Sequence, residues 1–188
     1  MPYCFRFCTG FQLFSRFLAL LALALLPLLG LMQHAHGASQ ASSTSVEALL
    51  AAGLAPSGVV FEIVDRDEAA LKRALPWVAE AANRLRSRFP QLPMAVVSHG
   101  REMFALKDSA RAENPEVHDL AQRLGKDQGI PIHVCETHAG WRGVLPEDFP
   151  KYIDVAPTGP AQVRSYLDLG YALVKVPRTS VMGRPPMP

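Results

Sequence analysis

Five short apolar runs recur along the chain, and segments with a helical pattern separate them. The runs occupy residues 59–64, 94–98, 130–135, 152–155 and 171–176. Apolar strands that alternate with helices are typical of a parallel sheet that is covered on both faces. The alternation therefore predicts an α/β fold of three layers, with a five-stranded, mostly parallel sheet and right-handed crossovers.

The longest helical pattern covers residues 68–89. Its apolar positions are three or four residues apart, which places them on one stripe of a helix. These positions are Leu71, Leu75, Val78, Ala82, Leu85 and Phe89. Asp67 is the predicted N-cap, and Pro76 predicts either a kink or the true start of the helix. Further helices are expected over residues 113–128 and 161–169.

Residues 1–37 have the pattern of a secretory signal peptide. Arg6 and Arg16 precede a charge-free apolar stretch, and small and polar residues follow it. We therefore expect a periplasmic or secreted protein that has no membrane association once the leader is cleaved. The alternative is an uncleaved membrane anchor, although the stretch is short for a spanning helix and Pro27 interrupts it.

Cleavage of the leader would leave a chain of balanced charge with a single cysteine. The full chain has 19 Lys and Arg residues against 17 Asp and Glu residues, and Arg6 and Arg16 belong to the leader. This balance gives no electrostatic basis for a nucleic-acid partner. Cys4 and Cys8 would leave with the leader, so Cys135 would have no partner for an internal disulfide. In an oxidising compartment such a thiol is buried, paired between chains or chemically active.

The rest of the chain is predicted to divide into three parts. Residues 38–57 are rich in Ala, Ser and Gly and are interpreted as a linker. Residues 58–177 form the α/β domain. Residues 178–188 are rich in proline and carry no periodic pattern, which predicts a disordered tail. The chain as a whole is 49% hydrophobic, which excludes a wholly disordered protein.

Two polar segments fall where neighbouring strands are predicted to end, and α/β sheets bind ligands at that edge. His99 follows the second strand, Cys135 ends the third, and His138 and Arg142 lie in the long irregular loop expected over residues 136–151. A thiolate at Cys135 could be stabilised by any of these three side chains or by loop N–H groups. Cys135 is therefore the candidate nucleophile. The spacing alone favours the alternative, a cysteine that only packs in the core, because free cysteine is among the most buried residue types.

The spacing of His133, Cys135 and His138 suggests a metal site as a further hypothesis. His133 and Cys135 share one face of a strand, and sulfur with imidazoles can hold zinc or copper. No fourth ligand is evident from the spacing, and a histidine inside an apolar strand is more often a hydrogen-bonded core residue. The sequence also lacks a glycine-rich phosphate loop. We therefore predict neither a metal centre nor a cofactor.

Two stretches resemble the DsrE/DsrF-like family. They read GIPIHVCETHAGWRGVLPEDFP and YIDVAPTGPAQVRSYLDLGYALVKV, and the similarity covers about residues 59–176. Family members carry a cysteine at the end of a strand, followed by a loop, a short strand, a helix and a final strand that opens on Gly-Tyr. Cys135 and Gly170-Tyr171 occupy the matching positions here.

The resemblance implies a small flavodoxin-like α/β domain that assembles as a trimer or hexamer. In the sulfur-oxidation and sulfur-relay members, the matching cysteine carries sulfur as a persulfide. The resemblance therefore predicts a sulfurtransferase-like carrier in which Cys135 accepts sulfur and exchanges it with a donor or acceptor protein. Two alternatives stay open at this point. One is a non-catalytic oligomeric module that binds a ligand or a subunit at the sheet edge, and the other is a metal-binding protein.

Overall fold

Five parallel strands form the central sheet of residues 42–178, the part of the chain that the computed structural model describes. They are β1 (Gly58–Ile63), β2 (Met94–Ser98), β3 (Ile132–Cys135), β4 (Asp154–Ala156) and β5 (Tyr171–Lys175). Their order across the sheet is β4-β3-β2-β1-β5. The predicted flavodoxin-like α/β class is confirmed, and every strand pair is parallel.

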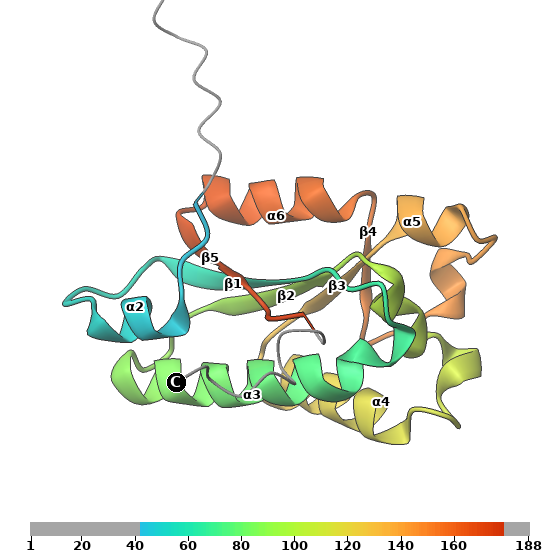
Figure 1. Ribbon diagram of the computed structural model, residues 1–188, viewed down its shortest axis with the longest axis horizontal. Helices are drawn as coiled ribbons and strands as arrows, with labels where there is room; N and C mark the ends of the chain where they lie inside the picture. The colour runs from blue at the N-terminus through green and yellow to red at the C-terminus, as the bar shows by residue number, and fades with distance from the viewer. Residues whose placement is uncertain (1–41, 179–188) are drawn as a thin grey trace, which may run out of the picture. The chain divides into compact units, whose positions relative to one another are not determined.

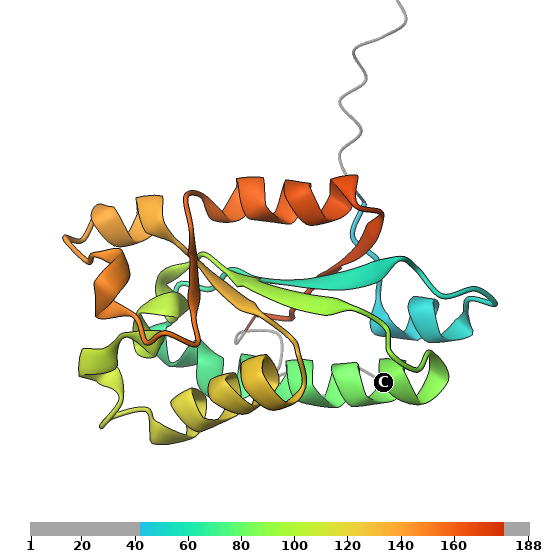
Figure 2. The ribbon, with the colours of Figure 1, turned by 180° about the vertical axis from the view of Figure 1, so that it is seen from behind.

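Helices cover both faces of the sheet, as expected. Figures 1 and 2 show α3 (Leu71–Arg88) and α4 (Pro115–Gln122) on one face and α6 (Gly159–Asp168) on the other. The short helices are α2 (Val46–Ala51), α5 (Glu136–Gly140), the 3-10 turns η1 (Glu68–Ala70), η2 (Arg101–Leu106), η3 (Asp108–Ala110) and η5 (Pro146–Asp148), and the π-helical turn η4 (Arg123–Asp127).

The strands send alternate side chains to the two faces. Val59, Phe61 and Ile63 of β1 are buried on the side of α3 and α4, in an apolar core that continues through the inner faces of those helices. On the α6 side the buried apolar cluster is much smaller. It consists of Val60, Val97, Val163 and Leu173.

The helix predicted over residues 68–89 is confirmed, and of the two alternatives at Pro76 the structure excludes the true start of the helix. The Asp67 carboxylate accepts the Ala69 N–H at 3.0 Å and so caps η1, which runs directly into α3. Pro76 lies inside α3 rather than at its start. The stripe of Leu71, Leu75 and other buried residues favours the helix on both sides of the proline, because this stripe faces the main core.

Part of the predicted linker is a helix. The side chain of Ser45 caps α2 by accepting the Ala48 N–H at 3.0 Å. Val46 and Leu49 of α2 are buried in the main core, and Glu47 binds Arg84 of α3 at 3.2 Å. The linker prediction is therefore wrong for residues 46–51, because two apolar residues one turn apart give this Ala-rich segment a face to bury.

The loop expected over residues 136–151 also contains regular structure. The helix α5 begins directly after β3, and η5 follows within the same segment. Burial of Ala139 and Phe149 fixes this connection against the core. The prediction of a wholly irregular loop is therefore wrong.

Two predictions concern residues outside the described part of the chain. The signal peptide of residues 1–37 lies there, and so does the tail beyond Arg178. Within residues 42–178, no helix is both long enough and apolar enough to span a bilayer.

Candidate functional site

A broad cleft of about 1340 Å³ opens at the carboxyl ends of the strands. Its walls come from the segments that follow β1, β2, β3, β4 and β5. The lining residues are Val64, Asp65, Arg66, Asp67, His99, Gly100, Arg101, Cys135, Thr137, His138, Trp141, Thr158, Pro160 and Arg178. This is the edge at which open α/β sheets bind ligands, and three of the four predicted site residues meet there: His99, Cys135 and His138.

Cys135 lies in the floor of the cleft, where β3 ends and α5 begins. Its Sγ accepts the backbone N–H of His138 at 3.3 Å, so the cysteine serves as the N-cap of α5. The residue is 5% exposed and lines the cleft. The sulfur is therefore enclosed but faces the cleft.

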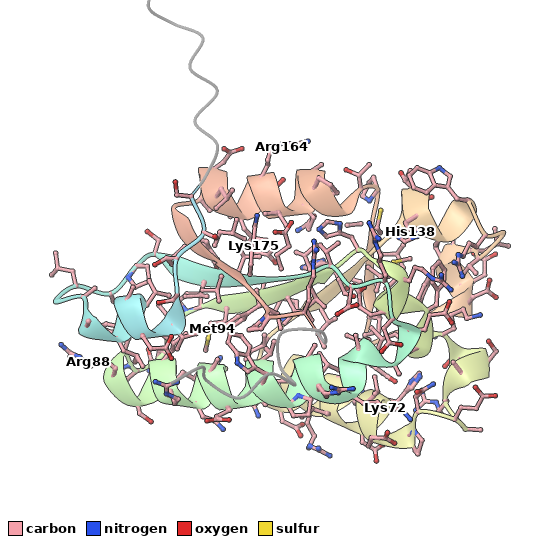
Figure 3. All side chains as sticks on the ribbon, viewed as in Figure 1. Lys72, Arg88, Met94, His138, Arg164 and Lys175 are labelled. Carbon is pink, nitrogen blue, oxygen red and sulfur yellow. The ribbon has the colours of Figure 1, made fainter. Side chains whose placement is uncertain are left out.

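The ring of His138 is fixed beside this sulfur. Its Nδ1 lies 2.9 Å from the backbone oxygen of His99, and because a carbonyl only accepts, Nδ1 carries the proton. The ring packs against Phe104 and Trp141, with centroid distances of 5.3 and 5.6 Å. Figure 3 shows the side chain of His138, which belongs to α5. Within residues 42–178, its Nε2 has no hydrogen-bond partner and is available to a ligand.

His99 is held by a carboxylate that the sequence analysis missed. Its Nε2 donates to Glu62 Oε1 over 3.0 Å, and the two side chains are 14% and 16% exposed. The hydrogen bond from His99 lowers the pKa of Glu62, against the effect of burial. The pair stands on the α6 side of the sheet, and Lys175 of β5 lies opposite Glu62 in the register. Figure 3 shows Lys175 on that side.

The position of His99 depends on a glycine in α6. A Cβ at Gly159 would overlap Cβ and Cγ of His99. Gly159 is also the first residue of α6, which Thr158 caps by accepting the Ala161 N–H at 3.2 Å. The start of α6 therefore rests directly on the histidine.

A second buried carboxylate, Glu102, ties the ends of β1 and β2 together. Its Oε2 accepts the Asp65 N–H at 2.7 Å, and its Oε1 accepts the Ser98 hydroxyl and the Gly100 N–H at 2.8 and 2.9 Å. The residue is fully buried, and this burial raises the pKa of Glu102 although the three donors oppose it. Glu102 therefore has a structural role beneath the cleft.

Arg142 does not take the position predicted for it. Its Nη1 binds Glu68 Oε1 at 3.1 Å, and its guanidinium lies over the Phe104 ring at 4.8 Å. Glu68 also binds Arg101 at 3.0 Å. Arg142 is absent from the cleft lining, because this ion pair and ring contact hold it beside η1.

The metal hypothesis finds no support in the geometry. His133 Nε2 lies 2.8 Å from the Tyr166 hydroxyl, and its Nδ1 is 3.9 Å from Asp154. Burial lowers the pKa of His133, which favours the neutral imidazole. Among residues 42–178 no three His, Cys, Asp or Glu side chains are grouped as a metal site requires.

No protein-family model matches the chain, and no curated protein matches it. One similar solved structure is a protein of unknown function from Methanobacterium thermoautotrophicum, with 18% identity and a TM-score of 0.49 over 62% of this chain and 96% of that one. Another is a conserved protein of unknown function from Bacteroides thetaiotaomicron, with 13% identity and a TM-score of 0.45 over 64% of this chain and 95% of that one.

Proposed function

We propose that this chain is a DsrE-like sulfur carrier that accepts sulfane sulfur on Cys135 as a persulfide. The observation that carries the proposal is the place of the Cys135 sulfur in the floor of the cleft, where it accepts the His138 N–H. The His99–Glu62 pair borders the same cleft. The resemblance of residues 59–176 to the DsrE/DsrF-like family supports the same chemistry.

The reaction requires no net oxidation and no cofactor. The Cys135 thiolate attacks the outer sulfur of a persulfide, R–S–SH. A new S–S bond forms to Cys135, the S–S bond of the donor breaks, and the donor leaves as the thiolate R–S⁻ with the electron pair. The proton stays on the transferred sulfur, so the product is Cys135–S–SH.

Two histidines have distinct roles in this scheme. The free Nε2 of His138 takes the proton of the Cys135 thiol and passes it to the leaving thiolate R–S⁻, because its Nδ1 is fixed as a donor to His99. His99 is oriented by Glu62, as carboxylates orient imidazoles in other acid–base sites. Arg142 has no direct role, because Glu68 holds it outside the cleft.

The proposal is tested by incubating the full chain with a small alkyl persulfide and measuring its intact mass. We expect a gain of one sulfur atom, which peptide mapping assigns to Cys135 rather than to Cys4 or Cys8. The Cys135→Ser variant is the matched control and gains no sulfur at that peptide. A wild-type chain that takes up no sulfur, or a gain that is equal in the variant, contradicts the proposal and favours a non-catalytic binding module.

We also propose that the protein is exported and assembles as a trimer or hexamer. The leader-like pattern of residues 1–37 supports export, and N-terminal sequencing of the mature protein checks it. The family resemblance supports the assembly, which native mass spectrometry measures. A full-length N-terminus or a monomer, respectively, would contradict these two expectations.

A further inference from the structure

Two arginines in the cleft have no ion-pair partner among residues 42–178. Arg66, after β1, and Arg178, after β5, both line the cleft and are exposed. Neither forms an ion pair or a side-chain hydrogen bond with any residue of 42–178. The third arginine of the cleft, Arg101, differs because Glu68 binds it at 3.0 Å. Arg66 and Arg178 are therefore the guanidiniums that are open to a ligand.

The nearby carboxylates are engaged elsewhere. Asp65 Oδ1 accepts the Asp67 N–H, and Asp67 Oδ1 accepts the Ala69 N–H, each at 3.0 Å. Glu62 accepts from His99, and Glu68 is shared by two arginines. Asp65 and Asp67 keep their negative charge in these bonds, but the cleft lining holds three arginines (Arg66, Arg101 and Arg178) against these two acids, so its charge is net positive.

An exposed aromatic side chain also lines the cleft. Trp141 is 78% exposed, which is unusual for an indole, and it lines the cleft with its ring 5.6 Å from that of His138. An indole of this kind can cover the carbon skeleton of a small organic ligand. A guanidinium binds a carboxylate or sulfonate through a planar fork of N–H donors.

We propose that the sulfur donor is a low-molecular-weight organic persulfide that carries a carboxylate or sulfonate group. Arg66 and Arg178 bind the anionic group, Trp141 covers the carbon skeleton, and the outer sulfur reaches Cys135. This inference rests on the proposed function for its sulfur step. The binding of the anionic group by Arg66 and Arg178 does not depend on that function, and the two parts are tested separately.

The first test compares the alkylation of Cys135 by iodoacetate, an anion, and by iodoacetamide, its neutral analogue. In both reactions the thiolate displaces iodide, so a C–S bond forms as the C–I bond breaks. The ratio of the two rates in the folded full chain is divided by the same ratio in urea, with peptide mapping at Cys135. We expect the folded chain to favour iodoacetate by about tenfold.

Variants assign that preference to the two arginines. Arg66→Gln and Arg178→Gln are each expected to reduce it about threefold, and the double variant to abolish it. Arg164→Gln is the matched control, because this exposed arginine is not among the residues that line the cleft. Figure 3 shows Arg164 on α6. A preference that is absent in the wild type, or equal in the double variant, overturns the inference.

The second test needs no reactive thiol. The full chain with Cys135→Ser is titrated calorimetrically with propanesulfonate and with neutral propanesulfonamide. We expect saturable binding of the sulfonate alone, weakened by added salt and lost in the Arg66→Gln/Arg178→Gln background. Absence of sulfonate binding overturns the inference even if Cys135 accepts sulfur. Sulfonate binding without any sulfur uptake by the wild type overturns the proposed function and leaves the anion site intact.

Discussion

The two faces of the sheet are built from the same strands but filled with different residues. On the side of α3 and α4, a continuous apolar core extends from β1 through both helices. On the α6 side four buried apolar residues share the surface with Glu62, His99 and His133, each of which is hydrogen-bonded. The difference indicates that one face supplies most of the stability while the other holds the titratable groups that border the cleft.

The largest effect on stability is expected from the apolar face. Leu75 is fully buried in α3, so Leu75→Ala should lower the free energy of unfolding by about 2–5 kcal/mol. Urea denaturation measures the loss, and sulfur uptake per folded molecule should not change. Leu169→Ala is the control, since that leucine is 66% exposed. A loss of uptake in folded Leu75→Ala would show that the two faces are not separable.

On the α6 face, in contrast, a substitution is expected to change sulfur uptake as well as stability. Gly159→Ala places a methyl group against His99 and should slow sulfur uptake by Cys135, with a destabilisation of about 1–3 kcal/mol. A Cβ at Gly140 meets nothing within 4 Å, so Gly140→Ala should leave both quantities close to wild type. Uptake kinetics and urea denaturation of the two variants decide the point. Equal uptake by both would mean that the position of His99 is unimportant.

The free energy of unfolding should depend on pH through His118, a buried histidine of α4. His118 Nε2 donates to the Ala105 carbonyl at 3.0 Å, so its Nδ1 accepts the Tyr152 hydroxyl at 2.6 Å. Burial lowers the pKa of His118 below its usual 6.5. The folded state therefore binds fewer protons than the unfolded state, and stability should fall as the pH drops below about 6.5.

The slope is at most about 1.4 kcal/mol per pH unit for one proton, and urea denaturation between pH 5 and 7.5 measures it. His118→Gln should reduce the slope, because glutamine does not titrate. Burial also lowers the pKa of His133, so His133→Gln on the other face is the matched comparison. A slope that neither substitution changes would assign the pH dependence to other groups.

The smallest effect is expected at α2, which packs on the apolar side. Glu47 and Arg84 form an exposed ion pair, with 69% and 45% of their side chains accessible. Glu47→Gln should therefore cost about 0.2–1 kcal/mol, and added salt should reduce the difference. Hydrogen exchange of the α2 amides gives the local readout. A cost of several kcal/mol would mean that the pair, rather than Val46 and Leu49, holds α2 in place.

Local patterns predicted most of the fold. The strand runs and the stripe of α3 appear directly in the sequence, since both depend on burial at a fixed period. The helix α2 was missed because Ala and Ser dominate its surroundings, although Ser45, Val46 and Leu49 carried a cap and a short apolar face. The helix α5 was missed because its N-cap is Cys135, which is not among the residues usually preferred there.

The site was less predictable, because its partners are distant in the sequence. His99, Cys135 and His138 could be placed at one edge since parallel strands align their carboxyl ends. Glu62 could not be paired with His99, which is 37 positions away, because a single acid in an apolar strand gives no hint of its partner. The engagement of Arg142 by Glu68, across 74 positions, was hidden for the same reason.

The buried carboxylate of Glu102 has a consequence for how this cleft can diversify. It fastens the segments after β1 and β2 into one rigid margin, so neither can be remodelled without leaving a carboxylate or an N–H group unpaired. New ligand preferences are therefore expected to arise by exchange of exposed cleft side chains, such as Arg66, Trp141 and Arg178, while the backbone of this margin stays unchanged.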